Sequence, residues 1–405
     1  MAIVLAFSGG LDTSFCVLYL REHYGDPVYT VTVNTGGIDE AEAERLAGWA
    51  KALGSAGHWT VDGRRELFVA HLSYLIKGNV LRGGVYPLCV GPERVVQARK
   101  VVEMARQLGA WAVAHGSTGA GNDQIRFDVA LRVLADDLAI LTPIRDLGWT
   151  REQTAAYLRA RGFPISEAKA SYSINRGLWG TTIGGRETLT PSEPLPPEAW
   201  VETQDPALAS QEGVELRIDF EKGLPTALDG EPMDPVALIE ALNRIGAAHG
   251  VGRGTHVGDT ILGIKGRIGF EAPAALVLIT AHRELEKLVL TKWQRFQKDH
   301  LADFYGMLLH EGQYFDPVMR DIEAFLDSSQ QFVTGTVRLR LQQGRIEVLG
   351  AESPYALFAP DLATYGEVNK LWSGRDAEGF ARIWGVPALL AHRVRSAFAT
   401  QPQKE

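Results

Sequence analysis

The feature that most constrains the fold is a glycine-containing segment near the start of the chain, Ala6-Phe-Ser-Gly-Gly-Leu-Asp-Thr-Ser14, which directly follows the apolar run Ile3–Leu5. An apolar strand, a Ser-Gly-Gly turn and an amphipathic stretch together predict a strand–loop–helix unit. Glycines allow several backbone N–H groups to point into one concavity, and the helix N-terminus behind them adds the positive end of a dipole. Because Thr13 and Ser14 add hydroxyls on the first helical turn, the unit suits a pyrophosphate group.

This segment is not a Walker A loop, because no Gly-Lys-Ser/Thr follows at the required spacing. The alternative is an ordinary glycine turn that joins a strand to a helix and binds nothing. The position of Asp12 and the two hydroxyls beside the turn favours the phosphate-binding interpretation.

The length and composition of the chain limit the kinds of molecule that it is expected to bind. With 405 residues, the chain is long enough for two or three domains. Its formal net charge of −8 argues against a nucleic-acid partner, which requires a basic face. The two cysteines form no Cys-x-x-Cys pair, and no histidines have metal-binding spacing. No apolar run approaches about 18 residues and the start is too short for a signal peptide, so we expect a cytoplasmic enzyme that binds no membrane.

Strand and helix patterns alternate over residues 1–167, which predicts an α/β domain with a doubly wound parallel sheet. Thr150, followed by Glu152 and Gln153, is typical of a capped helix start. Ligands of such sheets bind beyond the carboxyl ends of the strands, where the Ser8–Asp12 loop also lies. The expected strands are Ala2–Phe7, Pro27–Asn34, Ala110–Gly116 and Leu138–Thr142, and the expected helices are Asp39–Leu53, Glu93–Leu108, Asp123–Leu134 and Thr150–Arg161.

The pattern changes to an α+β region over residues 168–363. Val214–Phe220 alternates polar and apolar side chains, as a strand does. Asp234-Pro235 is a good cap and first turn for a helix over Val236–Ala248. Thr336–Leu349 alternates around a Gln-Gln-Gly-Arg turn, which indicates a hairpin. Residues 364–405 are expected to form a linker and a last helix over about Pro387–Ala399, which leaves the globule.

A second glycine-rich loop follows the third expected strand, His115-Gly-Ser-Thr-Gly-Ala-Gly-Asn-Asp-Gln-Ile-Arg-Phe-Asp128. Its glycines let the backbone approach a ligand, and Asn122, Asp123 and Arg126 then project from a helix N-terminus. By itself the motif would be explained by a helix cap and a solvated arginine. Two such loops at the ends of two strands of one sheet favour a ligand-binding site.

The first loop has the form S-G-G-x-D-[ST], which resembles the PP-loop of the ATP pyrophosphatases. With the second loop and further marks along nearly the whole chain, the sequence resembles the argininosuccinate synthase family. Those marks are Tyr172-Ser-Ile174, Leu178-Trp-Gly180, Asn243-Arg-Ile-Gly246, His249-Gly-Val-Gly-Arg253 and Asp376-Ala-Glu-Gly-Phe380.

The resemblance implies a ligase that uses ATP and Mg²⁺. ATP would adenylate the ureido oxygen of citrulline, and the amine of L-aspartate would attack the activated carbon to give argininosuccinate, AMP and pyrophosphate, a step of arginine biosynthesis. The protein's contribution to such a reaction is positioning and charge stabilisation. The resemblance also implies a homotetramer, with the C-terminal helix reaching a neighbouring subunit, and it makes residues 168–363 a synthetase domain.

The resemblance assigns roles residue by residue. The phosphates would be held by Ala6, Phe7, Ser8, Gly9, Gly10, Leu11, Asp12, Thr13 and Ser14, with Asp12 beside the Mg²⁺–pyrophosphate; Val33 and Gly116 would contact the adenosine; Thr118, Asn122, Asp123 and Arg94 would bind aspartate; and Tyr86, Asn122, Arg126, Ser173 and Thr182 would face citrulline. Asp12, Arg94 and Asp123 are the candidate catalytic residues. Asp123 can pair with the substrate ammonium, and the Arg94 guanidinium matches a carboxylate.

One departure from the family pattern, Ala120 for a lysine, removes a cation near the nucleotide. The others gather at the citrulline end: Gly91 for a serine, Gly258 for a glutamate, Phe270 for a tyrosine, and the segments Tyr172–Gly177 and Thr182–Gly185. The lost carboxylate would have paired the α-ammonium of citrulline. One interpretation is an N-acylated citrulline as acceptor, with Arg176 and Arg186 as candidates to meet an added carboxylate. The other is free citrulline bound through shifted residues.

Two further classes stay open at this point. A tRNA-thiolating or amidotransferase member of the PP-loop superfamily would need a basic surface, catalytic cysteines or a glutaminase domain, and none is evident. A non-catalytic nucleotide-binding paralogue is suggested only by the altered acceptor residues.

Overall fold

The computed structural model describes residues 1–119, 121–163, 172–362, 365–366 and 371–399. They form two compact units, residues 1–355 and 356–405, which are described separately. The domain boundaries expected at 167/168 and 363/364 both lie outside the described residues.

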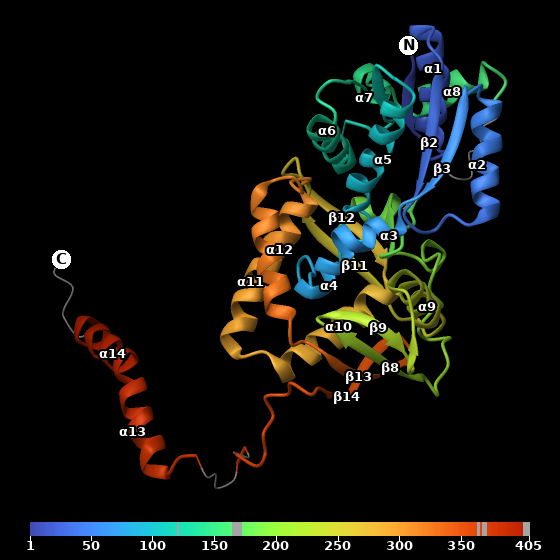
Figure 1. Ribbon diagram of the computed structural model, residues 1–405. Coiled ribbons are helices and arrows are strands. Elements are labelled where there is room, and N and C mark those ends of the chain that lie inside the picture. The colour runs from blue at the N-terminus through green and yellow to red at the C-terminus, as the bar shows by residue number, and fades with distance from the viewer. Residues whose placement is uncertain (120, 164–171, 363–364, 367–370, 400–405) are drawn as a thin grey trace. The chain divides into compact units, whose positions relative to one another are not determined.

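A five-stranded parallel sheet carries the N-terminal part of the first unit (Figure 1). Its order is β3-β2-β1-β4-β5, so the chain winds outward from β1 in both directions. The strands are β1 Ile3–Ala6, β2 Val28–Asn34, β3 Gly57–Asp62, β4 Ala112–Ala114 and β5 Ala139–Leu141. The edge strand β3 was not expected, because several of its side chains stay partly exposed and the alternation is weak.

Helices cover both faces of this sheet, which confirms the doubly wound α/β class. Alternate residues of β1 point to opposite sides: Ile3 and Leu5 pack in one apolar cluster with α1, α2, α7 and α8, and Val4 packs in another with α5 and α6. The capping box predicted at Thr150 is present. The helices are α1 Leu11–Tyr24, α2 Glu40–Ala52, α5 Glu93–Gln107, α6 Asn122–Leu134, α7 Pro143–Leu147 and α8 Arg151–Arg159.

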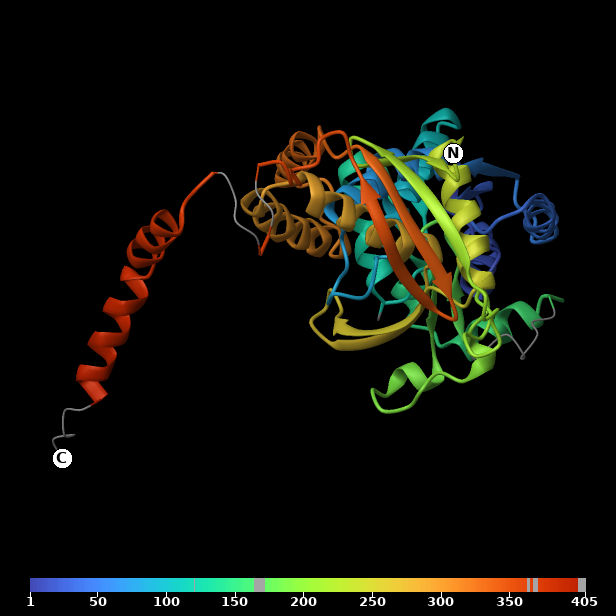
Figure 2. The same ribbon diagram turned by 90° about the horizontal axis from the view of Figure 1, so that it is seen from below.

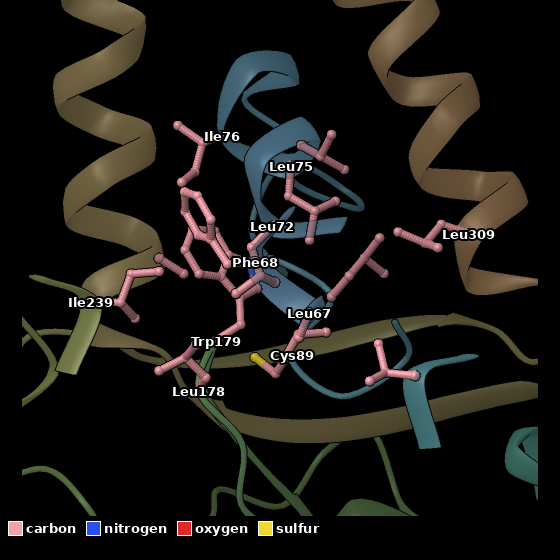
Figure 3. Packing of buried hydrophobic residues seen from close by; sticks show 14 of the residues in the cluster. Leu67, Phe68, Leu72, Leu75, Ile76, Cys89, Leu178, Trp179, Ile239 and Leu309 are labelled. Atoms are coloured by element: carbon pink, nitrogen blue, oxygen red, sulfur yellow. The ribbon is translucent and has the colours of Figure 1, made fainter. Parts of the chain in front are cut away.

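A helical segment between β3 and α5 joins the parallel sheet to the rest of the unit. It consists of α3 Arg64–Leu67, a π-helical turn Phe68–Leu72 and α4 Ser73–Gly78. Its apolar side chains face Trp179, which lies between Phe68 and Ile239 in Figure 3. The Trp179 indole is fully buried and donates its N–H to the Pro87 carbonyl at 2.8 Å. One continuous apolar cluster therefore supports both the parallel sheet and the elements that follow.

Two antiparallel sheets follow in the sequence. The larger has the order β10-β9-β8-β13-β14, and its long β13–β14 hairpin is the orange-red pair in Figure 2. Both predicted features are present, the strand at Val214 and the hairpin, whose turn residues Gln343 and Gly344 have φ values of 46° and 80°. These strands are β8 Val214–Glu221, β9 Leu224–Leu228, β10 Glu231–Pro232, β13 Gly335–Gln342 and β14 Arg345–Glu352.

The smaller sheet, of order β11-β12-β7-β6, forms a wall of the candidate site. Its strands are β6 Ser173–Asn175, β7 Thr181–Gly184, β11 Arg253–Asp259 and β12 Lys265–Glu271, and the short 3₁₀ turns Arg186–Leu189 and Pro197–Ala199 follow β7.

Four helices complete the first unit. α9 begins after the predicted cap Asp234, whose side chain accepts from the Val236 amide. The other three were not predicted. Their bounds are α9 Pro235–Ala248, α10 Pro273–Val289, α11 Lys292–His310 and α12 Pro317–Gln330.

The described residues of the second unit include two helices, α13 Gly374–Trp384 and α14 Val386–Ala399. α14 confirms the expected last helix, whereas α13 occupies a stretch for which no helix was predicted. Both carry exposed apolar side chains, among them Phe380, Trp384 and Leu390. No helix within the described ranges is long and apolar enough to cross a membrane.

Candidate functional site

A cleft of about 830 Å³ lies at the carboxyl ends of β1, β2 and β4. Its walls come from the two glycine loops, the loop after β2, the N-terminus of α5 and the small sheet. The parallel-sheet topology predicts a ligand site at this edge.

The first glycine loop presents an open helix end to the cleft. No side chain caps Gly10 at the start of α1, so the first N–H groups of the helix remain available for an anion. The Ser8 and Thr13 hydroxyls lie 3.1 Å apart and brace the loop. Burial raises the pKa of Asp12, and the charge of Arg151 partly opposes this shift.

Two residues of this loop have packing roles in the structure. Gly9 has φ of 69°, and an added Cβ would come within 2.3 Å of Leu46, so only glycine fits. The Ser14 hydroxyl is buried and accepts the Trp49 indole N–H at 2.8 Å. Neither residue is among those that line the cleft, whereas Ala6, Phe7, Ser8, Gly10, Leu11, Asp12 and Thr13 all are.

The second glycine loop packs directly on the first. An added Cβ at Gly116 would lie 3.1 Å from the Thr13 methyl and 3.2 Å from the Asp12 carbonyl carbon. Val33 from β2 lines the same part of the cleft. Apart from Gly9 and Ser14, the structure thus brings the residues expected to hold ATP together along one cleft.

A bracing network behind this loop was missed by sequence reasoning. The buried His115 ring donates from Nε2 to Asp128 at 3.0 Å and accepts at Nδ1 from the Ser117 amide at 3.3 Å. Asp128 also pairs with Arg145 at 2.7 Å. His115 and Asp128 are the first and last residues of the glycine-loop motif, so the sequence already contained both members of this network.

Arg94 and Asp123 meet in the middle of the cleft. The Arg94 guanidinium and the Asp123 carboxylate are 3.0 Å apart, and Arg126 pairs with the other oxygen of Asp123 at 3.0 Å. Burial acts to raise the pKa of Asp123, but the charges of Arg94 and Arg126 outweigh it and hold the pKa at about 2. Asp123 is therefore ionised at neutral pH. Thr118 and Asn122 line the cleft beside it.

Glu93 is a buried acid that the sequence did not single out. Burial raises its pKa to about 8, against the opposing effects of Arg94 and a hydrogen bond from Thr35. Its Oε1 atom has no hydrogen-bond partner and lies where a Cβ on Gly177 would be, at 1.7 Å. Gly177 therefore leaves the space that Glu93 occupies.

The end of the cleft expected to hold the acceptor is formed by Tyr86, β11 and β12. The Tyr86 ring stacks on His256 at 5.6 Å between centroids and packs against Phe270 at 5.3 Å. Phe270 is fully buried and lies under Gly254 rather than facing the cleft. Gly258 lines the cleft, and an added Cβ there would lie 2.5 Å from His256 Nε2.

Arg82 and His310 also lie at this end, and neither was predicted. Arg126 donates to the His310 carbonyl at 2.9 Å and contacts Nδ1 of the same ring at 3.0 Å, while Arg82 contacts its Nε2. Burial, together with the charges of Arg126 and Arg82, lowers the pKa of His310 to about 3. In the sequence, the position of Arg82 beside two glycines just before Tyr86 could have indicated that it reaches the site.

The remaining acceptor predictions have mixed outcomes. Ser173, Thr182 and Arg176 line the cleft, but Arg176 is held by Glu202 at 2.5 Å. Arg186 is not among the cleft residues. Ala120, the expected position of a missing lysine, lies outside the described residues.

Comparison with known proteins identifies the family of the chain. The family model described as arginosuccinate synthase N-terminal HUP domain matches residues 2–164, and the model of the arginosuccinate synthase C-terminal domain matches residues 172–391. The chain belongs to the argininosuccinate synthase family.

Curated relatives extend over nearly the whole chain. The argininosuccinate synthase of Methanocaldococcus jannaschii is 41% identical over 387 residues, covering 96% of this chain and 97% of the relative. That of Pyrobaculum aerophilum is 40% identical over 396 residues, covering 97% and 98%. A solved structure, a predicted subunit of tRNA methyltransferase from M. jannaschii, is 17% identical, covers 42% of this chain and 94% of its own, and has a TM-score of 0.27. As a member of this family, the protein is a ligase that binds a nucleotide.

Proposed function

We propose that this ligase uses ATP to adenylate the oxygen of a ureido group and then joins the activated carbon to L-aspartate. The ureido oxygen attacks the α-phosphorus, and pyrophosphate leaves. The aspartate amine then attacks the ureido carbon, and AMP leaves with the ureido oxygen. With citrulline as acceptor the product is argininosuccinate.

The Arg94–Asp123 pair is the observation that carries the aspartate assignment. The two groups have opposite charge, and both line the cleft beside the glycine loops. A zwitterion can replace their mutual contact with two contacts of its own, its ammonium on Asp123 and a carboxylate on Arg94. The site would then hold the aspartate amine close to the loop expected to bind the phosphates.

The phosphate assignment is supported by two open helix ends. Neither Gly10 at α1 nor Gly121 at α6 carries a side-chain cap, and both helices begin at the cleft. Mg²⁺ in nucleotide sites is often bound by one or two carboxylates together with the phosphates. Among the described residues no group of three or more His, Cys, Asp or Glu side chains could hold a metal alone. Asp12 fits the role of the single carboxylate that would meet Mg²⁺ carried by pyrophosphate.

The assay is product analysis with ATP, aspartate and a ureido acceptor. We expect AMP and pyrophosphate in equal amounts, dependent on all three substrates. Asp12→Ala should abolish turnover, while the exposed Asp137→Ala should retain it. Primary formation of ADP and orthophosphate would contradict the proposal.

We also propose a homotetramer, assembled in part through the second unit. The apolar side chains of α13 and α14 are exposed within the chain itself, and large exposed apolar patches mark interaction sites.

A further inference from the structure

Four side chains form an arginine–histidine cluster at the acceptor end of the cleft: Arg82, Arg126, His256 and His310. They come from α6, β11, α11 and the loop before Tyr86, so no spacing in the sequence indicates that they meet. Arg126 and His310 are buried, and His256 stacks on Tyr86.

The His310 ring cannot satisfy both arginines. Arg126 and Arg82 approach opposite nitrogens of this ring. A neutral imidazole has one acceptor nitrogen and one N–H, and a charged imidazole has no acceptor. At least one of the two guanidinium groups therefore points an N–H at a ring nitrogen that cannot accept it. Arg82 has fewer charged partners than Arg126. Arg126 pairs with the Asp123 carboxylate, whereas the other hydrogen bond of Arg82 goes to the Asp259 backbone carbonyl at 2.7 Å.

Within the described part of the chain, no carboxylate forms an ion pair with Arg82, His256 or His310, and Asp259 and Glu311 attract Arg82 only from a longer distance. Asp123 is shared between Arg94 and Arg126. Asp259 pairs with Lys265 at 2.7 Å and is exposed. Among the described residues, no carboxylate lies within ion-pair distance of Arg82. His256 Nε2 is also shielded from solvent and has no hydrogen-bond partner among the described residues.

Two glycines lie against this cluster. A Cβ at Gly258 would come within 2.5 Å of His256 Nε2, so His256 would have to move. A Cβ at Gly91 would make an ordinary contact of 3.5 Å with the Arg126 guanidinium carbon. The space that the glycines leave lies against positive charge and N–H donors.

We propose that the acceptor is a ureido carboxylic acid without a free α-ammonium, whose carboxylate is bound by Arg82 together with His256. This inference rests on the proposed function and names its acceptor class. A carboxylate supplies the acceptor that Arg82 lacks, and it can accept from His256 Nε2 in the tautomer that carries the proton on this nitrogen. In a free amino acid the α-ammonium is attached next to the carboxylate, so it would lie near the same guanidinium group with no carboxylate of the described residues in ion-pair contact with Arg82, which is unfavourable.

Two kinds of molecule share this chemistry, an N-acylated citrulline and an ω-ureido acid with no α-nitrogen. The test compares kcat/KM for N-acetylcitrulline, 5-ureidopentanoate and free citrulline, with ATP and aspartate saturating. We expect one or both of the first two to exceed citrulline by at least about tenfold, which corresponds to about 1.4 kcal/mol. The better of the two identifies the source. A preference for citrulline by the same factor would overturn the inference while leaving the proposed function intact.

Variants separate a binding role of Arg82 from a structural one. Arg82→Gln should raise KM for the preferred acid at least about tenfold and leave KM for ATP unchanged. Arg82→Lys, which keeps the charge, should recover part of the loss, and the exposed Arg65→Gln should match the unmodified protein. Titration calorimetry of the acid with each variant gives a readout that does not depend on turnover. If Arg82→Gln folds and binds the acid normally, the assignment of Arg82 is wrong. If no ureido acid supports pyrophosphate release, the proposed function itself fails.

Discussion

The Arg94 guanidinium lies 3.0 Å from the Asp123 carboxylate, so the two groups proposed to bind aspartate neutralise each other. The pair keeps two buried charges satisfied. The pair would therefore offer the proposed aspartate two charged contacts, while neither of its own charges is left without a counter-ion.

Asp123→Asn should raise KM for aspartate. The amide keeps the shape of the side chain but loses the charge that would pair the ammonium. A hydrogen bond to a charged group is worth roughly 1.5–3 kcal/mol, so we expect an increase of about 10- to 150-fold. Steady-state kinetics with varied aspartate measures it, and Asp137→Asn, an exposed change, is the control. An unaltered KM, or equal activity with ammonia in place of aspartate, would refute the assignment.

Gly116→Ala should weaken ATP binding. Its added methyl would press on Thr13 at 3.1 Å and push the two glycine loops apart. We expect KM for ATP to rise by about tenfold or more, with KM for aspartate less affected. Gly48→Ala is the matched control, because it lies within α2 and its Cβ would meet nothing within 4 Å. Equal effects of the two changes would contradict the close packing of the loops.

Glu93→Gln should flatten the dependence of stability on pH. Burial raises the pKa of Glu93 to about 8 in the folded protein from the ordinary 4.5. Because the pKa of Glu93 is higher in the folded than in the unfolded protein, its protonated form stabilises the fold, and this contribution is complete below pH 4.5. This contribution falls as pH rises, until about pH 8. Denaturant unfolding of both proteins from pH 4.5 to 9 tests this. The variant should lose less of its free energy of unfolding over this range, and parallel curves would show that Glu93 does not titrate there.

Removal of the second unit should change the assembly. α13 and α14 expose Phe380, Trp384, Leu389 and Leu390, and a chain ending at Tyr355 would lack all of them. We expect light scattering to show a tetramer for the whole chain and a smaller species for the shortened one. A monomeric whole chain at micromolar concentration would contradict the proposed tetramer.

Local signals in the sequence predicted the elements that carry their own caps and turns. Thr150, Asp234 and the Gln343-Gly344 turn act within a few residues, so their structures could be inferred without the rest of the chain. α10, α11 and α12 were not predicted, and β3 was missed because the strand lies at an edge and stays partly exposed.

In the candidate site, too, the parts built from contiguous residues could be predicted, and the parts built from distant residues could not. The glycine loops are contiguous motifs, and the sequence placed both at strand ends of one sheet. The arginine–histidine cluster is assembled from residues as far apart as Arg82 and His310. No spacing in the sequence indicates such a contact, since only the packing of α11 against the other elements creates it. For the same reason Arg176, which the sequence offered as a partner for a carboxylate, turned out to be held by Glu202.

The central claim is tested most directly by following the ureido oxygen. The acceptor is labelled with ¹⁸O in its ureido group and incubated with ATP, aspartate and Mg²⁺, and the nucleotide product is analysed by mass spectrometry. Adenylation of that oxygen predicts one ¹⁸O atom in each AMP formed, with unlabelled pyrophosphate. Unlabelled AMP, or release of ADP and orthophosphate as the primary products, would contradict the account.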